Sequence, residues 1–378
     1  MPAAAPHLLH VLPSFGVAGI QVRLAQVINA LRQHYRHTII PLDGITTCIE
    51  RVDPDNFVAA LPFARGGAGP FGRICRIRRT IAEQAPDLLL TYNWGTIEWA
   101  LANRHLPLSA HIHFEDGFGP EEVDAQLRRR VYVRRLALRS ARKVVVPSHT
   151  LLQLALRDWR LDAQQVLHIP NGIDVDALKA TATAAPLFDR RPGDIVVGTI
   201  APLRPEKNIG LLIRAIARAG DERLRLVIAG DGKQRQDLER EARIYLGDRA
   251  LFLGSVAQPA RVLRQLDIFA LSSDTEQMPM TILEAAAMGL PIAAVAVGDV
   301  PLMVSHENRP FVVAKSDETG LAAALQALSR DELLRRRLGT LNERHIRAEY
   351  PLDRMIATYE SMLSSVMAPD GKNTGAKP

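Results

Sequence analysis

Short apolar runs alternate with stretches of helical periodicity along almost the whole chain. After the first apolar run, the residues Val22, Ala25, Ile28 and Leu31 recur three apart, which is the spacing of one helix face. Strands that alternate with helices in this way are typical of parallel sheets whose strands are joined by crossover helices. The pattern therefore predicts an α/β fold.

The apolar runs predict two similar sets of strands. In the first half they are His7–Leu12, His37–Leu42, Asp87–Tyr92, Ala110–Phe114, Lys143–Pro147 and Val166–Ile169. In the second half they are Asp194–Ile200, Leu224–Ala229, Leu251–Leu253, Asp267–Leu271, Pro291–Val297 and Pro310–Ala314. Helices are expected in the second half at Asn208–Ala219, Lys233–Leu246, Pro259–Gln265, Met280–Met288 and Glu318–Ser329. The pattern thus predicts two Rossmann-like, doubly wound parallel-sheet domains.

The two sets of strands are separated by a stretch without periodicity, in which proline and small residues gather. A chain of 378 residues also fits two domains better than one. We expect an N-terminal domain at 1–175, a linker at 176–193, a C-terminal domain at 194–350, a helix at 351–367 that packs back on the N-terminal domain, and a disordered tail at 368–378. Ligands of such sheets gather at the carboxyl ends of the strands, so we expect the site in a cleft between the domains.

The composition is that of a soluble globular protein, with 47% apolar residues and a mean hydropathy of −0.01. No apolar run approaches the roughly 18–20 residues that a membrane span needs. The N-terminus lacks the basic lead of a secretory signal. Cys48 and Cys75 are the only cysteines, and no Cys/His grouping has metal-binding spacing. We therefore expect a cytoplasmic protein without a disulfide framework or a metal site.

The net charge of +6 lies mainly in the first half, where residues 1–175 carry 20 Lys and Arg against 15 Asp and Glu. The excess concentrates between Arg128 and Lys143 in a basic amphipathic stretch, with a smaller arginine cluster between Arg73 and Arg79. Two interpretations stay open: peripheral contact with the inner, anionic face of a membrane, or a solvated helix face. Nucleic-acid binding is not expected, because aromatics are scarce and no recognition module is present.

The strongest candidate for a ligand loop is SSDTEQMPMTILEAAAMG, in which Glu276 and Glu284 bracket a turn that leads into a helix. A helix N-terminus suits a phosphate, and the two carboxylates can accept hydrogen bonds from sugar hydroxyls. A structural alternative is a capping box, in which Glu284 bonds the backbone at Thr281.

A second polar loop, APLRPEKNIG, places Arg204 and Lys207 just before the next expected helix. Lysine and arginine both suit phosphate, and the loop lies at the same sheet edge as the two glutamates. A cation loop beside a carboxylate loop indicates a diphosphate linked to polyhydroxylated rings. The alternative is a surface turn with a charged helix cap. A third turn at Gly230–Gly232 would let a backbone approach a nucleotide.

In the first half, His113 ends the strand Ala110–Phe114, and Glu115 and Asp116 follow directly. These acidic residues would orient an acceptor sugar or begin a loop. A glycine-containing turn, SFGVAG, follows the first strand at the edge where ligands gather. For His113 both a polar role at the site and a structural role stay open.

Taken together, these motifs resemble the family 4 glycosyltransferases, whose hallmark is two glutamates separated by seven residues. Glu276 and Glu284 match this spacing, and EAAAMGLPIAA matches the usual continuation. RPEKN resembles the phosphate loop of the family, PNGID at 170–174 its crossover between domains, and GDG at 230–232 also fits. The likeness covers nearly the whole chain and is most specific over residues 194–300.

The resemblance implies a GT-B fold, metal-independent transfer with retention of anomeric configuration, and no cofactor beyond a nucleotide-diphosphate sugar as donor. A UDP-sugar is one such donor. By the same resemblance Lys207 would hold the diphosphate, Glu284 would bond the ribose, and Glu276 would face the donor sugar. The backbone expected to meet sugar or phosphate belongs to Pro279, Met280 and Thr281.

The resemblance also assigns roles in the first half and shows departures from the family. Gly19 would let the first loop approach the diphosphate, and His113 would lie near the donor sugar and the acceptor hydroxyl. The phosphate arginine of the family is replaced by Pro202, and Arg204 is the candidate to substitute for it. Pro279 removes one backbone donor from the glutamate loop.

The sequence therefore predicts a hexosyltransferase-type glycosyltransferase of polysaccharide biosynthesis, which moves a sugar to a carbohydrate or lipid-linked acceptor. Cleaving a sugar–diphosphate bond leaves negative charge on the phosphate, and Lys207 would stabilise it. The alternatives are a non-hydrolysing nucleotide-sugar epimerase and a non-catalytic sugar-nucleotide-binding protein. A glycosidase, which pairs two carboxylates as acid and base, is disfavoured because it has no need for a cation loop.

Overall fold

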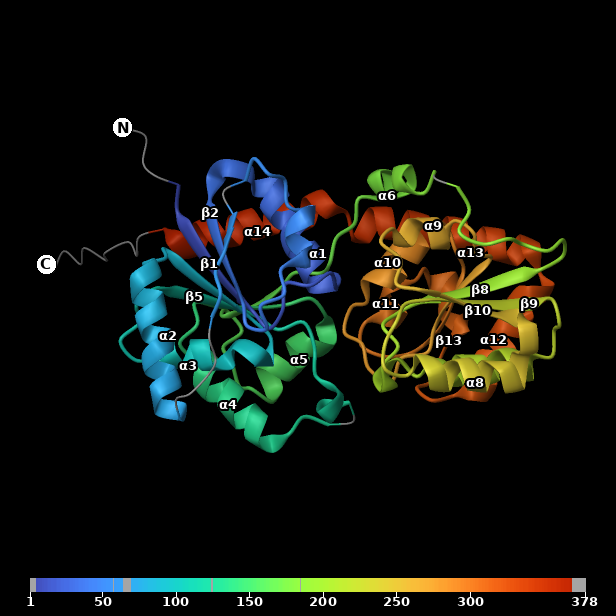
Figure 1. Ribbon diagram of the computed structural model, residues 1–378, viewed down its shortest axis with the longest axis horizontal. Coiled ribbons are helices and arrows are strands. Elements are labelled where there is room, and N and C mark those ends of the chain that lie inside the picture. The colour runs from blue at the N-terminus through green and yellow to red at the C-terminus, as the bar shows by residue number, and fades with distance from the viewer. Residues whose placement is uncertain (1–4, 57, 64–68, 124, 184, 369–378) are drawn as a thin grey trace, which may run out of the picture.

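The computed structural model describes residues 5–368, except 57, 64–68, 124 and 184. It has two parallel-sheet α/β domains that lie side by side, as Figure 1 shows. The tail expected to be disordered at 368–378 lies outside the described residues, apart from Ala368. The expected fold class, two doubly wound sheet domains, is confirmed.

The N-terminal domain is built on a seven-stranded sheet with the order β3-β2-β1-β4-β5-β6-β7, in which neighbouring strands are parallel. Its strands are β1 His7–Leu12, β2 Arg36–Pro41, β3 Val58–Ala60, β4 Leu88–Tyr92, β5 Ala110–Phe114, β6 Lys143–Val146 and β7 Val166–His168. Its helices are α1 Gly19–Leu31, α2 Pro70–Gln84, α3 Ile97–Arg104, α4 Arg128–Leu138 and α5 His149–Arg157.

The C-terminal domain has a six-stranded parallel sheet with the order β10-β9-β8-β11-β12-β13. Its strands are β8 Ile195–Ile200, β9 Leu224–Ala229, β10 Ala250–Gly254, β11 Ile268–Leu271, β12 Ile292–Val295 and β13 Val312–Val313. The helices of this half are α6 Val175–Thr181, α7 Ile209–Ala219, α8 Arg235–Leu246, α9 Pro259–Leu263, α10 Met280–Ala287, α11 Val300–Met303, α12 Glu318–Arg330 and α13 Glu332–Glu349, and α14 Leu352–Met367 follows them.

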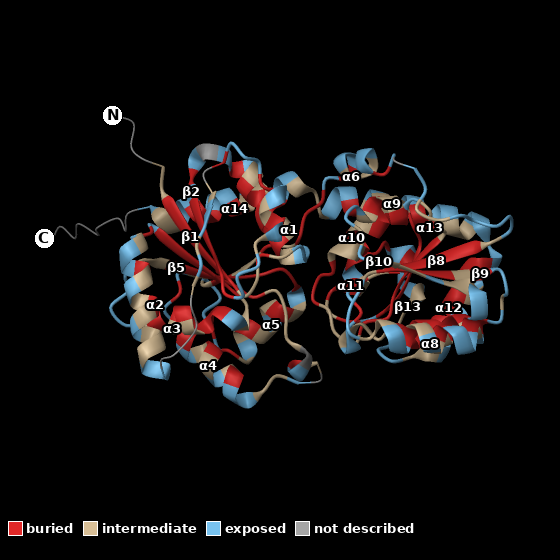
Figure 2. Ribbon diagram, in the orientation of Figure 1, coloured by how far each residue is buried: buried red, intermediate tan, exposed pale blue. Residues whose placement is uncertain are grey.

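Each sheet is covered on both faces by helices that bury one apolar side. In the N-terminal domain, α1 and α14 pack on one face of the sheet, and α2, α3, α4 and α5 pack on the other. Figure 2 shows buried residues along the strands and exposed residues on the outer sides of the helices. Burial on both faces explains why the strands read as continuous apolar runs.

Most expected strands and helices agree with the structure to within one or two residues, and His7–Leu12, Ala110–Phe114 and Leu224–Ala229 agree at both ends. Several elements were not named in advance, among them the strand β3 and the helices α2, α3, α5, α11 and α13. β3 is short and its residues are exposed or half-buried, so its apolar signal is weak. A helix, α6, occupies the first part of the stretch expected as a linker.

The basic stretch between Arg128 and Lys143 was expected to form a basic amphipathic helix ahead of the strand at Lys143–Pro147, and the structure differs in which side chains of that helix are buried. The helix α4 ends at Leu138, and Lys143 already begins strand β6. Within α4 the burial is inverted, because Arg134 is fully buried whereas Leu136 is 48% exposed. Buried carboxylates that pair with the guanidinium make this inversion tolerable.

The chain crosses between the domains twice, and the two crossings are hydrogen-bonded to each other. Ile173 donates its backbone N–H to the Tyr350 carbonyl at 2.9 Å, and Leu352 donates to the Ile173 carbonyl at 3.2 Å. A Cβ on Gly172 would lie 2.9 Å from the Cα of Leu352, so this position requires glycine. After the second crossing, α14 buries Tyr359 in the core of the N-terminal domain. Within the described residues, no helix combines the length and apolar character needed to cross a membrane.

Candidate functional site

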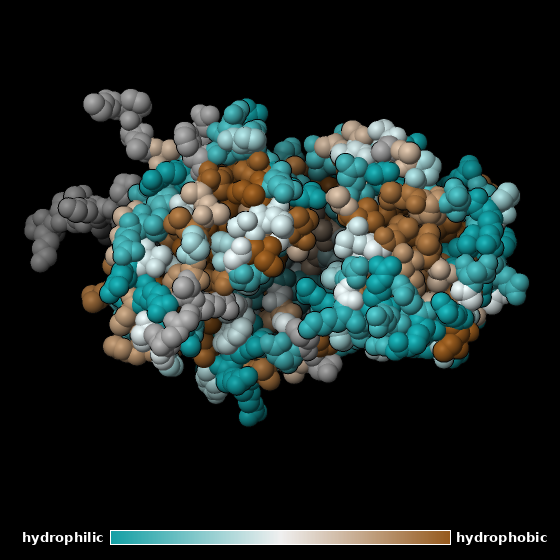
Figure 3. Space-filling model, viewed as in Figure 1, coloured by the Kyte–Doolittle hydropathy of each residue, from teal (hydrophilic) through white to brown (hydrophobic). Residues whose placement is uncertain are grey.

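A pocket of about 320 Å³ lies between the two domains, at the carboxyl ends of strands from both sheets. The N-terminal domain lines it with Gly19 and Arg23 of α1 and with Asp116 from the loop after β5. The C-terminal domain lines it with Lys207 and Glu276. Figure 3 shows the recess between the domains from one side. Each half of the chain thus contributes a cation and a carboxylate to one pocket.

Lys207 and Glu276 form an ion pair on the C-terminal wall, with 2.6 Å between Nζ and Oε1. Their side chains are 18% and 14% exposed, so both remain accessible from the pocket. The same Oε1 of Glu276 accepts a hydrogen bond from Ser273 Oγ at 2.8 Å. The structure therefore brings together the cation loop and the carboxylate loop that the sequence placed at one sheet edge.

These two loops are braced against each other by further hydrogen bonds. The backbone N–H of Asp274 donates to the Glu206 carbonyl at 2.8 Å, and Asn208 Nδ2 donates to Asp274 Oδ1 at 2.9 Å. Asn208 adopts a left-handed backbone with φ of 44°, which asparagine tolerates better than most residues, and it caps α7. The spacing between Lys207 and Glu276 is therefore set by backbone contacts as well as by their charges.

Two helix N-termini point their first turns at the same pocket. α1 begins at Gly19 after Ala18, and α10 begins at Met280 after Pro279. Neither helix has a side chain that caps it, so the N–H groups of these first turns are left for a ligand or water. The capping box weighed for Thr281 and Glu284 does not form, because Thr281 lies inside α10. The predicted residues Pro279, Met280 and Thr281 all line the pocket.

Glu284 lies one turn further along α10 and does not line this pocket. Burial raises the pKa of its carboxyl to about 7, while the charge of Arg51 acts weakly in the opposite direction. Arg51 belongs to the N-terminal domain, in the 3-10 turn Thr47–Arg51. With its pKa near neutrality, Glu284 is therefore partly protonated at pH 7.

Two other predicted residues of the C-terminal domain lie outside the pocket. The side chain of Arg204 is 66% exposed, and its nearest carboxylate is Glu206 at 4.0 Å. Gly230 has a φ of 148°, and a Cβ there would lie 1.9 Å from the carbonyl oxygen of Ala201. Gly230 is thus required for the close packing of two loops, whatever it contributes to a ligand.

His113 and Glu115 are fully buried and do not line the pocket either. The His113 Nδ1 lies 2.8 Å from the hydroxyl of Thr91, and Glu115 accepts a hydrogen bond from Arg134 at 3.2 Å. Side chains alternate along an extended segment, so Asp116, the next residue, faces the other way. Of these three residues named from the sequence, the structure brings only Asp116 to the pocket.

Arg23 and Asp116 form the second charged pair of the pocket; the sequence named Asp116 as a residue that would orient an acceptor sugar or begin a loop, but it did not single out Arg23. Arg23 Nη2 lies 2.6 Å from Asp116 Oδ1, and both side chains are 6% exposed. One signal was available, since Arg23 occupies a position on the apolar side of α1 between Ile20 and Val27. A buried arginine on an apolar helix face requires a charged or polar partner, but the neighbouring sequence does not show which residue that partner is.

A larger pocket of about 840 Å³ continues the cleft on the far side of Glu276, which lines both. Its N-terminal wall comes from α4 and α5, including Tyr132 and Arg135. Its C-terminal wall includes Asp274, Gly298 and Lys315. Two neighbouring compartments that share one carboxylate suit two substrates that meet at that carboxylate.

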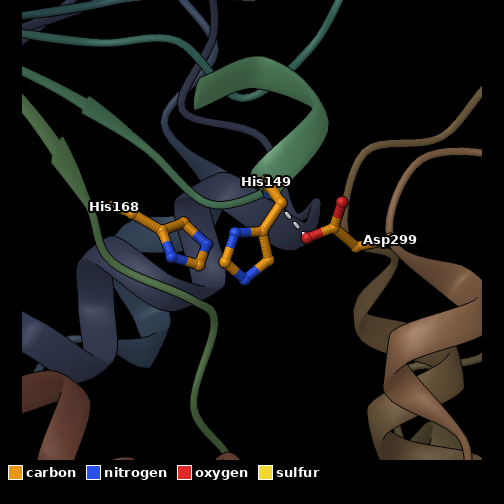
Figure 4. Close-up of side chains that lie close together, drawn as sticks. All are labelled: His149, His168 and Asp299. Atoms are coloured by element: carbon orange, nitrogen blue, oxygen red, sulfur yellow. Dashed lines mark hydrogen bonds between the residues drawn. The ribbon is translucent and has the colours of Figure 1, made fainter. Parts of the chain in front are cut away.

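Asp299 connects the domains beside the larger pocket, which its neighbour Gly298 and its partner Thr150 line. Figure 4 shows its carboxylate directed at His149 of α5. Its carboxylate accepts hydrogen bonds from the backbone N–H of His149 at 2.7 Å and from the N–H and hydroxyl of Thr150 at 3.2 Å. Among the described residues, His149, His168 and Asp299 form the group that could hold a metal ion, with ligand atoms within 4.8 Å of one another. Because the Asp299 oxygens already accept three hydrogen bonds, the cluster serves first to cap α5 from the opposite domain.

Both domains match families of glycosyltransferases. Residues 18–172 match the glycosyl transferase 4-like domain, and residues 194–331 match the glycosyl transferases group 1. The N-acetyl-alpha-D-glucosaminyl L-malate synthase of Bacillus anthracis is 27% identical over 173 residues, which are 45% of this chain and 45% of that protein.

The UDP-Gal:alpha-D-GlcNAc-diphosphoundecaprenol alpha-1,3-galactosyltransferase of Escherichia coli is 23% identical over 269 residues, 68% of this chain and 70% of that protein. Among solved structures, Anabaena HepE in complex with UDP-glucose superposes with a TM-score of 0.78 at 18% identity, covering 95% of this chain and 99% of that one. The chain thus spans less than half the length of the first of these curated relatives, and the structural likeness supports the fold alone.

Proposed function

Since the chain belongs to the glycosyltransferases, with a 4-like domain followed by a group 1 domain, we propose that it transfers a sugar from a nucleotide-diphosphate sugar to a carbohydrate or lipid-linked acceptor. The observation that carries this proposal is the Lys207–Glu276 pair in the interdomain pocket, with an uncapped helix N-terminus on each side. The transferred unit that we propose is a hexose.

The donor diphosphate is assigned to the positive groups of the pocket. Lys207 is a compact cation, and the first turns of α1 and α10 add N–H donors and partial positive charge from both domains. When the sugar leaves, negative charge builds on the diphosphate, and these groups stabilise it without having to move. We propose that this arrangement suffices for transfer without a divalent metal and with retention of configuration.

The two glutamates of the family motif are assigned to the sugar and to the nucleoside. Glu276 lies beside Lys207 and takes hydroxyls of the transferred sugar. Glu284, one turn into α10, takes ribose hydroxyls and is fully ionised when it does so. The complex of HepE with UDP-glucose and the UDP-Gal in the name of the E. coli relative support a UDP-sugar as donor.

The acceptor is assigned to the 840 Å³ pocket beyond Glu276. Its walls offer hydroxyl, carboxylate and guanidinium groups, which suit a polyhydroxylated acceptor. The name of the E. coli relative refers to a sugar linked to diphosphoundecaprenol, which supports a lipid-linked acceptor as one possibility to test.

A lipid-linked acceptor would bring the protein to a membrane surface, and α4 offers a face for this. Arg128 and Arg129 on that helix and Arg139 directly after it are exposed, together with Tyr132, which is 66% exposed, and Leu136. Basic side chains interleaved with an aromatic and a leucine suit the anionic headgroup region of a bilayer. We propose peripheral attachment to the inner face of the membrane through this α4 face.

The first test is transfer by Lys207→Ala and Glu276→Ala variants with UDP-sugar donors. We expect each to lose about 10²–10³-fold in kcat, because each removes a group that acts on the charge or the sugar that moves. Arg218→Ala is the matched control, since it removes a 56% exposed, ion-paired cation on α7 away from the pocket. Wild-type rates in both pocket variants would exclude the assignment.

The same assay separates transfer from the two alternatives. Incubation with donor alone would produce an isomeric donor only if the protein were an epimerase. Donor binding without transfer across a broad acceptor panel would indicate a non-catalytic binding protein. Equal rates with magnesium and with chelator are expected for the proposed reaction.

A further inference from the structure

The carboxylate of Asp116 has one oxygen without a partner. The side chain is 6% exposed and lines the 320 Å³ pocket. Its Oδ1 is bound by Arg23 at 2.6 Å, whereas its Oδ2 is buried and has no hydrogen-bond donor among the described residues. Leaving a buried carboxylate oxygen unsatisfied is costly, so a ligand that donates to it gains the binding energy that the protein itself does not supply.

Asp116 is held in this position by contacts that reach across the domain boundary. Arg23 Nη1 donates to Asn171 Oδ1 at 2.7 Å, and Asn171 Nδ2 donates to the carbonyl of Met278 at 2.9 Å. Met278 lies two residues from Glu276 in the same loop. The backbone N–H of Asp116 also donates to Asn93 Oδ1 at 2.7 Å. The position of Asp116 is therefore coupled to the loop that carries Glu276 in the opposite domain.

The chemistry of a carboxylate decides which part of a donor it can meet. An ionised carboxylate only accepts hydrogen bonds, so it requires a donor group from the ligand. A phosphate oxygen offers none and is repelled by the charge. The hydroxyls of a sugar do offer such donors, and the transferred sugar occupies the same pocket in the proposed function.

Resting on the proposed nucleotide-sugar donor, we propose that Asp116 is a binding residue for the transferred sugar. Its Oδ2 accepts a hydrogen bond from one sugar hydroxyl, while Glu276 holds the sugar from the other domain. Arg23 is the positioning residue that orients the Asp116 carboxylate. The two carboxylates, one from each domain, then bind the sugar together only when the domains lie against each other as in this structure.

The test compares binding of UDP with binding of UDP-hexoses, beginning with UDP-glucose, in the wild type and in Asp116→Asn. We expect the variant to bind UDP within about twofold of wild type, since phosphate oxygens offer no hydrogen-bond donor to a carboxylate. Its affinity for the UDP-hexose and its kcat/KM should fall by about 10- to 100-fold, the loss expected for a hydrogen bond to a charged group. The control is Asp194→Asn, which removes another arginine-paired carboxylate, bound to Arg225, far from the pocket.

A series of monodeoxy UDP-hexoses identifies the hydroxyl. In the wild type, removing the hydroxyl that meets Asp116 should weaken binding, whereas in Asp116→Asn the parent and that deoxy donor should bind more nearly alike. If no hydroxyl position shows a deoxy effect that differs between wild type and Asp116→Asn, the inference is overturned. It is also overturned if Asp116→Asn weakens the binding of UDP as much as the binding of the UDP-hexose. If Asp116→Asn does not fold, Asp116→Glu keeps the charge, and the same cycle is measured with it.

The outcome for Asp116 is separable from that of the proposed function. If wild-type protein binds no nucleotide or Lys207→Ala binds UDP normally, the proposed donor site itself is wrong. If UDP binding depends on Lys207 but removal of each sugar hydroxyl weakens binding equally in wild type and in Asp116→Asn, only the inference about Asp116 is wrong.

Discussion

Glu284 combines a buried position with a carboxyl whose pKa is raised to about 7. A glutamate in the unfolded chain titrates near 4.5, so between these two pH values the folded protein binds more protons than the unfolded one. Stability contributed by this residue therefore falls as pH rises from about 4.5 through 7. Above this pH range the ionised carboxylate of Glu284 lowers the stability of the fold, and such a cost is expected of a residue that binds a ligand.

Replacing Glu284 by Gln should separate these two effects. At pH 8 the variant should be more stable than wild type by about 1–3 kcal/mol, because no charge has to be buried, and at pH 4.5 the difference should vanish. Denaturant unfolding at both pH values measures this. UDP affinity should fall in the variant at pH 8, since an amide accepts ribose hydroxyls less well. The same stability difference at both pH values would contradict the assignment of the raised pKa.

Residue type and spacing predicted that Lys207 and Glu276 lie at one sheet edge, but they did not predict that Arg23 pairs with Asp116. The first pair belongs to two loops that follow strands of one sheet, each with its own local signal. For the second pair the sequence marked the end of β5 but not which side chains face the cleft. His113 and Glu115 turned away because consecutive side chains of an extended segment alternate, and the sheet decides which side is which.

At the scale of elements, helix α4 shows how far composition can mislead. Its arginines look equivalent in sequence, but Arg134 is fully buried among Glu115, Glu122 and the rings of Trp94, Phe118 and Trp159. On the opposite side of the helix Arg129 is exposed. One helix thus carries a structural arginine inside the domain and a basic face outside it.

Substitutions on the two sides of α4 should have opposite consequences. Arg134→Ala should destabilise the protein by about 3–5 kcal/mol, because it leaves the buried carboxylate of Glu115 without its guanidinium partner. The triple variant Arg128→Glu, Arg129→Glu, Arg139→Glu should leave the melting temperature nearly unchanged and abolish sedimentation with vesicles that contain anionic lipid. Vesicles of neutral lipid alone are the control. Unchanged vesicle binding by the triple variant would remove the membrane role of this face.

At the scale of the whole molecule, Asp299 caps a helix of the other domain. An ordinary N-cap stabilises its own helix, whereas this one also favours the apposed arrangement of the two domains. Ser148 adds a second contact, since its hydroxyl donates to Gln277 Oε1 at 3.1 Å. The pocket residues of both domains meet only in that arrangement, so these contacts bear on donor binding.

Asp299→Ala should shift the protein toward open forms. We expect a larger radius of gyration in small-angle X-ray scattering without ligand and weaker binding of UDP-sugar, with the shift reversed at saturating donor. Asp317→Ala is the matched control, because Asp317 caps α12 within its own domain through the N–H of Gly320. Both variants should lose about 1 kcal/mol of stability. The same radius in both variants would show that Asp299 does not hold the domains together.

The sequence by itself determined most strands and helices, the repeated sheet plan and the two loops that carry Lys207 and Glu276, because each is encoded in neighbouring residues through periodicity, helix formers and turn residues. Tertiary structure alone decided which buried charges meet. Arg23 and Asp116 are 93 positions apart, and Asp299 caps a helix that begins 150 positions earlier. Such pairs depend on the strand order and on how two sheets face each other, and no local pattern encodes either.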